Sequence, residues 1–285
     1  MRLLKIALAS ICGLALLVYC AAMGWLWFAQ EKLIFMPTAL PPSAVLSQRD
    51  DVREVVVSVP GGTNAPGAPN APGAQLSVLQ LKLPSPKGVV FFLHGNSGNA
   101  VTWLIDPDFY RRANFDVVMM DYRGYGKSTS AITSEAQLRQ DVRAVWDHFV
   151  PQYQNKKWLL LGRSLGTSLA AGLSVELARA GRAPNATILV SPYESFAALA
   201  ALHYPLVPQA LLRYPMHTDQ WVAQMQSPLL ILHGDQDTLI PLQHSQALAK
   251  LAPQSKLQII AGAGHNDLQK FSSYTQAIED VMAGL

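Results

Sequence analysis

The chain has 285 residues, 50% of them apolar, and a formal net charge of +3 at pH 7. This length suffices for one large α/β domain of roughly 250 residues with its own hydrophobic core. Arg2 and Lys5 supply two of the positive charges, so the remainder is nearly neutral. Composition therefore excludes an extended basic surface, and we expect no nucleic-acid partner.

Residues 6–29 carry no charged side chain. As an α-helix this segment would be roughly 36 Å long, enough to cross a bilayer. Because Arg2 and Lys5 precede it, the positive-inside rule predicts a cytoplasmic N-terminus and a domain on the non-cytoplasmic side. We expect residues 1–29 to be a single-pass anchor, in the inner membrane if the protein is bacterial. A cleaved signal peptide with Cys20-Ala-Ala22 as its cleavage site is disfavoured, because the apolar run continues beyond that site.

Residues 30–285 alternate between strand-like and helix-like patterns. Val52–Val59 and 75–83 predict an antiparallel pair, and the Pro/Gly-rich segment 60–74 between them predicts a flexible loop. Helix-length segments separate the apolar runs that follow, which lie at 89–93, 115–120, 158–161, 186–190, 229–232 and 256–260. This alternation predicts an α/β fold with a mostly parallel sheet flanked by helices. Both cysteines, Cys12 and Cys20, lie in the anchor, so we expect no disulfide in the domain.

Two helices of this domain have clear end signals. Ser134 and Gln137 form a capping-box pattern, and the helix that follows carries one apolar stripe: Leu138, Val142, Val145, Trp146 and Phe149. Near the C-terminus, Asp267 is expected to cap the final helix, whose apolar stripe is Phe271, Tyr274 and Ile278.

The sequence Gly162-Arg-Ser-Leu-Gly166 lies between an apolar strand-like run and a small-residue helical run. This is a G-x-S-x-G pattern in a strand–turn–helix context. Its glycines permit a sharp turn that leaves the hydroxyl of Ser164 exposed at the end of the strand. We predict that Ser164 is a nucleophile.

A serine nucleophile needs a base, and the base needs a group that orients it. His265 follows the apolar run 256–260 and is the predicted general base and acid. The orienting carboxylate precedes it in the chain; Asp235 and Asp237 both follow the run 229–232, and Glu194 is a more distant alternative. The chain therefore contains a nucleophilic serine, an orienting carboxylate and a basic histidine in the order that suits a parallel α/β sheet.

The oxyanion hole requires backbone N–H groups directed at the developing negative charge. Leu165 directly follows the nucleophile and is expected to supply one of them. The loop after 89–93 is expected to supply the other, with Asn96 favoured over Ser97. His94 and His233 precede glycines at strand ends and are expected to hydrogen-bond loop backbone.

Six motifs resemble those of the α/β-hydrolase superfamily: His94-Gly-Asn-Ser-Gly98, Asp121-Tyr-Arg-Gly-Tyr-Gly126, Gly162-Arg-Ser-Leu-Gly166, Ser191-Pro-Tyr193, His233-Gly-Asp-Gln-Asp237 and Gly264-His265. Together with Glu31-Lys-Leu-Ile-Phe-Met-Pro37, they are similar to the single-pass, membrane-anchored serine hydrolases whose animal members include protein depalmitoylases. The family's H-G-x-x-D pattern implies that Asp237 orients His265. The resemblance also implies a short helical cap above the active site, at residues 191–227.

The cap region is rich in apolar side chains, and Pro205, Pro208 and Pro215 divide it into short pieces. It is either ordinary helix packing or an apolar wall for an acyl chain.

These observations predict a membrane-anchored serine hydrolase that cleaves an ester or thioester of an apolar acyl group, using Ser164, His265 and Asp237. The mechanism needs neither a metal nor an organic cofactor. The expected partners are the membrane, through residues 6–29, and a small-molecule, lipid-like or acylated-protein substrate. An aminopeptidase-type amide hydrolase and a catalytically silent scaffold on the same fold are the alternatives.

Overall fold

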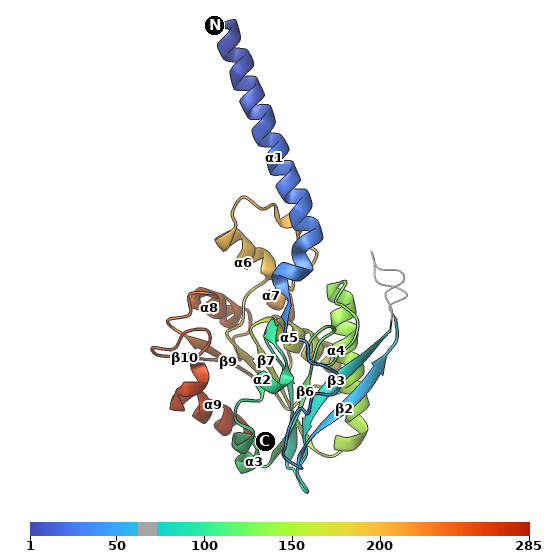
Figure 1. The fold of residues 1–285 in the computed structure, drawn as a ribbon. Coiled ribbons are helices and arrows are strands. Elements are labelled where there is room, and N and C mark those ends of the chain that lie inside the picture. Colours follow the sequence, from blue (N-terminus) through green and yellow to red (C-terminus); the bar gives the residue numbers. More distant parts are fainter. Residues whose placement is uncertain (62–72) are drawn as a thin grey trace.

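The computed structural model describes residues 1–61 and 73–285. The predicted loop at 60–74 lies mostly outside the described residues. A long N-terminal helix, α1 (Arg2–Ile34), projects from an α/β domain that contains the other elements (Figure 1).

The domain is built on an eight-stranded sheet in the order β10-β9-β8-β7-β4-β6-β3-β2. Neighbours from β10 to β6 are parallel, whereas β3 is antiparallel to both β6 and β2. The bounds are β2 (Val52–Val59), β3 (Ala74–Leu81), β4 (Gly88–Leu93), β6 (Phe115–Met120), β7 (Lys157–Arg163), β8 (Ala186–Val190), β9 (Leu229–Gly234) and β10 (Lys256–Ile260). The predicted α/β fold, with its antiparallel pair and six parallel strands, is confirmed.

Both faces of the sheet are covered because its strands are apolar on both sides. In β4, Phe91 belongs to the buried cluster on one face, which includes side chains of α4 (Glu135–Phe149), α5 (Leu165–Arg179) and α8 (Leu242–Leu251). Phe92 belongs to the cluster on the other face, with side chains of α3 (Pro107–Ala113) and α9 (Ser272–Ala283). A short parallel pair, β1 (Met36–Pro37) and β5 (Ser97–Gly98), joins the end of α1 to the loop after β4. The helix α2 (Ala100–Trp103) follows that loop.

The end signals of α4 and α9 are confirmed only in part. The Ser134 hydroxyl accepts the N–H of Gln137, and the whole predicted stripe of α4 is buried. The Gln137 amide oxygen, however, accepts the N–H of Thr133, so only half of the capping box forms. The prediction for Asp267 is wrong: a 3-10 turn separates it from α9, and its carboxylate accepts the N–H of Gly264 at 2.7 Å.

The predicted cap contains α6 (Phe196–His203), a 3-10 turn at Gln209–Leu211 and α7 (Thr218–Val222). It lies beside the domain-proximal part of α1 (Figure 1). The path of the chain from Ser195 to Arg213 runs away from the sheet and returns to it.

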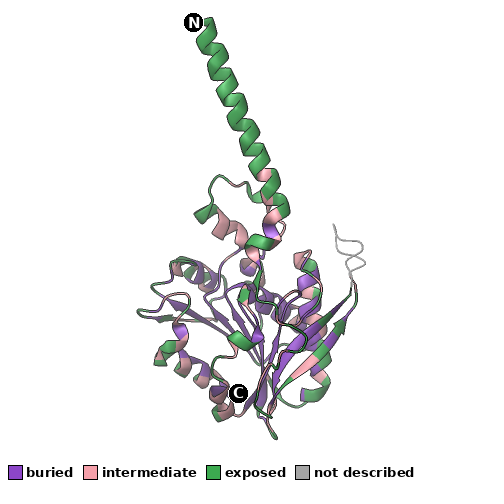
Figure 2. Cartoon of the chain, in the orientation of Figure 1, coloured by how far each residue is buried: buried purple, intermediate pink, exposed green. Residues whose placement is uncertain are grey.

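Helix α1 is long and apolar enough to cross a membrane by its length and composition. It extends to Ile34, beyond the predicted limit at Ala29. Figure 2 shows that most of its length is exposed; the helix contacts the domain in its C-terminal half, from Tyr19 onward.

Candidate active site

Ser164 lies in a strained turn between β7 and α5. Its φ of 51° is in the left-handed region, which side-chain-bearing residues seldom adopt. Its N–H donates to the Val190 carbonyl at 2.9 Å, which ties the turn to the neighbouring strand. A strained serine at the end of a central strand is the geometry expected of a nucleophile elbow.

The two glycines of the motif are required by close backbone contacts. A Cβ atom at Gly166 would lie 1.9 Å from the Leu93 carbonyl oxygen, and one at Gly162 would lie 2.4 Å from the Gly166 carbonyl oxygen. Both distances are far below van der Waals contact. Glycine therefore allows α5 to begin directly against β4, which positions the turn.

The structure brings the three predicted catalytic residues together. His265 Nε2 lies 3.2 Å from Ser164 Oγ, and His265 Nδ1 lies 2.7 Å from Asp237 Oδ2. The carboxylate accepts a hydrogen bond from the Nδ1–H group, which leaves the Nε2 lone pair facing the serine hydroxyl. This tautomer allows His265 to take the proton of Ser164.

Asp237 is buried and strongly hydrogen-bonded. Its Oδ1 accepts the N–H groups of Leu239 at 3.0 Å and Ile240 at 2.8 Å, and His233 Nε2 lies 3.4 Å from its Oδ2. Burial raises the pKa of Asp237, but the hydrogen bonds from His233, His265 and Ile240 outweigh it and hold the pKa well below the usual range. The group is therefore a carboxylate that can stabilise a protonated His265.

The alternative carboxylates are engaged elsewhere. Asp235 accepts the N–H of Gly262 at 2.8 Å, and Glu194 lies 3.0 Å from His244 Nδ1. Of the three carboxylates considered, Asp237 is the one bonded to His265. Position in the loop did not separate Asp235 from Asp237, but the H-G-x-x-D pattern favoured Asp237, which is the carboxylate that the structure pairs with His265.

The two glycine-preceding histidines bond to loop backbone as expected. His94 Nδ1 lies 2.7 Å from the Gly95 carbonyl, and His233 Nε2 lies 2.7 Å from the Ile240 carbonyl. Sequence reasoning missed the second role of His233, which is its contact with Asp237. The four-residue spacing within one loop was the available signal.

Arg163 also acts on the site, and sequence reasoning missed it. The side chain is buried; it donates to the His265 carbonyl at 2.9 Å and to the Gln269 side chain at 3.1 Å, and its guanidinium covers the Trp103 ring. The loop that carries the histidine is therefore fixed by the residue before the nucleophile. In G-x-S-x-G this residue is a variable position, so the motif gave no signal.

The predicted oxyanion donors lie beside the nucleophile. Leu165 is the first residue of α5, where an N–H group has no partner within the helix. Asn96 belongs to the loop after β4, and a Cβ atom at the adjacent Gly95 would lie 3.6 Å from Ser164 Cβ. The Asn96 carbonyl accepts from Met36 N–H and Tyr125 hydroxyl, and its side chain donates to the Ile34 carbonyl. The bonds with Met36 and Ile34 hold the loop against the end of α1, and the bond with Tyr125 ties it to the segment after β6.

A hollow of about 210 Å³ lies at this edge of the sheet. The oxyanion loop, α2, Arg163 and the histidine loop border it, through Ser97, Gly98, Thr102, Trp103, Ile105, Arg163, Asn266 and Gln269. Its lining includes Asn266, the residue after His265, so it is a candidate space for part of a substrate.

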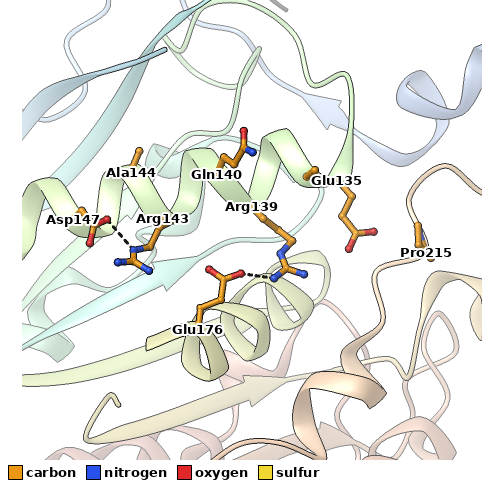
Figure 3. Close-up of a pocket in the computed structure, with 9 residues that line it drawn as sticks. Glu135, Arg139, Gln140, Arg143, Ala144, Asp147, Glu176 and Pro215 are labelled. Carbon is orange, nitrogen blue, oxygen red and sulfur yellow. Dashed lines mark hydrogen bonds and ion pairs between the residues drawn. The ribbon is translucent and has the colours of Figure 1, made fainter. Parts of the chain in front are cut away.

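A larger hollow of about 660 Å³ lies between α4 and α5 and contains none of the predicted catalytic residues. Figure 3 shows four of its charged side chains in two pairs, Arg139 with Glu176 and Arg143 with Asp147. The hydrogen-bonded geometry of Ser164, His265 and Asp237, and not the size of a cavity, marks the candidate site. Within residues 1–61 and 73–285, no group of three or more His, Cys, Asp or Glu side chains is placed to hold a metal ion.

Comparisons with known proteins agree with this geometry. Residues 84–220 match the family model described as serine aminopeptidase, S33, and residues 200–269 match the model of the alpha/beta hydrolase fold. The chain is a member of the α/β-hydrolase superfamily. The predicted family is therefore confirmed.

Relatives of this α/β-hydrolase span both bacteria and animals. It is 28% identical to an uncharacterized protein of Mycobacterium tuberculosis, over 94% of this chain and 91% of that protein. It is 27% identical to human alpha/beta hydrolase domain-containing protein 17C, over 70% of this chain and 59% of that protein. An esterase of Pyrococcus furiosus shares the fold, with a TM-score of 0.65, 17% identity and coverage of 88% of this chain and 97% of the esterase.

The close approach of α5 to β4 predicts different effects for two glycines in one helix. Gly166→Ala is expected to lower the free energy of unfolding by about 3 kcal/mol or more, because its Cβ would overlap the Leu93 carbonyl. Gly172→Ala is the matched control: its Cβ would meet side-chain atoms at 3.6 Å, and alanine favours a helix by up to about 1 kcal/mol. Denaturant unfolding in detergent measures both. Equal stability of the two variants would contradict this account of the turn.

The lowered pKa of Asp237 predicts a loss of stability in acid. An aspartate in an unfolded chain has a pKa of about 3.9, so as the pH falls the unfolded state binds the proton first. The contribution of Asp237 is therefore fully present above about pH 4 and is lost as the pH falls toward the lower, folded-state pKa. The urea midpoint should fall more between pH 7 and pH 3 for the natural protein than for Asp237→Asn. Equal decreases would contradict the low pKa.

Proposed function

We propose that this protein is a membrane-anchored serine hydrolase that cleaves carboxylic esters or thioesters of an apolar acyl group. The hydrogen-bond chain from Asp237 through His265 to Ser164, at a strained turn beside two candidate oxyanion donors, carries the proposal.

In the first half of the reaction Ser164 Oγ attacks the acyl carbonyl carbon while His265 Nε2 takes the hydroxyl proton. The negative charge that develops on the carbonyl oxygen is stabilised by the N–H groups of Leu165 and Asn96. Asp237 stabilises the positive charge on His265. His265 then gives its proton to the leaving alkoxide or thiolate, and Ser164 remains acylated.

In the second half His265 removes a proton from water, and the resulting hydroxide attacks the acyl carbon of the ester on Ser164. Collapse of the tetrahedral intermediate releases the carboxylic acid, and His265 returns the proton to Ser164. Every proton moves through His265, so these steps need neither a metal nor an organic cofactor.

The apolar acyl preference rests on the cap. The cap is rich in apolar residues and lies beside the domain-proximal part of α1 (Figure 1), where a membrane would present lipid-like or acylated substrates.

A second activity is favoured by one observation, the family model described as serine aminopeptidase that matches residues 84–220. The same three side chains serve amide hydrolysis by the same steps. A catalytically silent scaffold is disfavoured because none of the three side chains is missing.

The triad predicts the response to substitution. Ser164→Ala and His265→Ala should each lower kcat/KM on p-nitrophenyl esters by about 10⁴-fold or more, and Asp237→Asn by about 10²–10⁴-fold. Asp235→Asn is the matched control in the same loop and should retain at least about half of the natural turnover. Fluorophosphonate labelling should require Ser164.

The outcomes separate the three candidate functions. Turnover of amino-acid p-nitroanilides in preference to esters of any chain length would favour the amide hydrolase. A folded Ser164→Ala protein that hydrolyses esters as fast as the unsubstituted protein would refute the mechanism. Absence of both probe labelling and turnover would favour the scaffold.

The anchor and its orientation are part of the proposal, supported by the length and composition of α1 and by Arg2 and Lys5 before it. The full chain should resist carbonate extraction from membranes, and protease added on the non-cytoplasmic side should digest the domain. Digestion only from the cytoplasmic side would reverse the orientation. A soluble protein with a mature N-terminus near Met23 would instead indicate a cleaved signal peptide.

A further inference from the structure

The tip of the cap, residues 195–212, is an uncharged and exposed surface. No Asp, Glu, Lys or Arg lies between Glu194 and Arg213. Three large side chains at its centre are exposed: Leu202 at 55%, Tyr204 at 66% and Leu206 at 78%. Apolar side chains clustered in this way, with no charged residue among them, mark a surface that contacts another apolar phase.

The cap tip contacts the side of α1, well above the point where that helix enters the domain. The Tyr19 hydroxyl donates to the Leu206 carbonyl at 2.9 Å. Figure 1 shows the loop between α6 and α7 reaching up beside the helix. Tyr19 belongs to the uncharged run 6–29 and lies six residues before Trp25, roughly 9 Å along the helix axis. If α1 spans a bilayer and Trp25 lies at the boundary between lipid and water, then Leu206, which contacts Tyr19, lies within the apolar layer of the bilayer.

A second set of contacts fixes α1 to the base of the cap. The Gln30 side chain donates to the Leu211 carbonyl at 2.7 Å and accepts the Arg213 N–H at 2.9 Å. Glu31 pairs with the Arg213 guanidinium at 2.6 Å and accepts the Tyr214 hydroxyl at 2.8 Å. These bonds link adjacent residues of α1 to the base of the cap, so they fix the position of the cap along the axis of the helix.

We propose that the cap tip inserts into the non-cytoplasmic leaflet beside α1, so that the protein has two membrane contacts. Its partner is the lipid bilayer at the boundary between head groups and acyl chains, where apolar surfaces insert about 5–10 Å. The tip carries no cationic Lys or Arg, so its insertion depends on apolar burial and not on anionic lipid. This inference rests on α1 spanning the membrane and is independent of the hydrolase chemistry.

The test uses the full chain in nanodiscs of palmitoyl-oleoyl phosphatidylcholine. Cys12 and Cys20 are replaced by Ala, and one cysteine carrying an environment-sensitive fluorophore is introduced as Leu206→Cys or Val45→Cys. Val45 is the matched control: its side chain is 79% exposed, close to the 78% of Leu206, but it lies in the loop that leads to β2. Phosphatidylcholine spin-labelled near the head-group end of its acyl chain serves as the quencher. Circular dichroism verifies that each labelled variant is folded.

The expected result is a blue-shifted emission at position 206, and at least a twofold greater quenching by spin-labelled lipid there than at position 45. The same quenching should appear in nanodiscs with and without anionic phosphatidylglycerol. A fluorophore at 206 that is as water-exposed and as weakly quenched as that at 45 would overturn the proposal. A blue-shifted fluorophore that the lipid does not quench would also overturn it, and would indicate that a second copy of the chain covers the tip. Because neither measurement uses turnover, a failure here is distinct from a failure of the proposed hydrolase activity.

Discussion

The site depends on the contact between the start of α5 and the end of β4. Gly166 lies directly against the Leu93 carbonyl, and the chain can make this approach only without a side chain at that position. The approach forces Ser164 into a left-handed conformation that the hydrogen bond from its N–H to Val190 retains. Strain of this kind costs about 1–3 kcal/mol, and the packed sheet around it supplies the stability that keeps the turn in place.

From that contact the rest of the site follows by topology. Strands β4, β7, β8, β9 and β10 are parallel neighbours, so their carboxyl ends meet at one edge of the sheet. The loops after β4, β7, β9 and β10 carry Asn96, Ser164, Asp237 and His265 to that edge. Bonds from Arg163 and Asp267 brace the histidine loop, and bonds from His233 and Ile240 brace the carboxylate. The catalytic groups are thus held by backbone and buried polar contacts.

The N-terminal helix is integrated with the domain and is more than a tether. Its end bonds the oxyanion loop through Ile34 and Asn96, and its last turns bond the cap through Gln30 and Glu31. The helix therefore contacts two parts that border the reaction centre.

Patterns along the chain were sufficient to predict the α/β sheet, the long apolar N-terminal segment, and Ser164 and His265 as candidate residues that the structure brings within hydrogen-bond distance. They were sufficient because strand hydrophobicity, an uncharged run and the G-x-S-x-G spacing are local properties. The tertiary structure decided what depends on distance between segments. It pairs Asp237, and not Asp235, with His265. It also shows that Arg163 and His233 contact the histidine loop and Asp237, and that Asp267 bonds Gly264 and does not begin α9. It also brought Tyr19 and Leu206 together, a contact between residues 187 positions apart that no local pattern encodes.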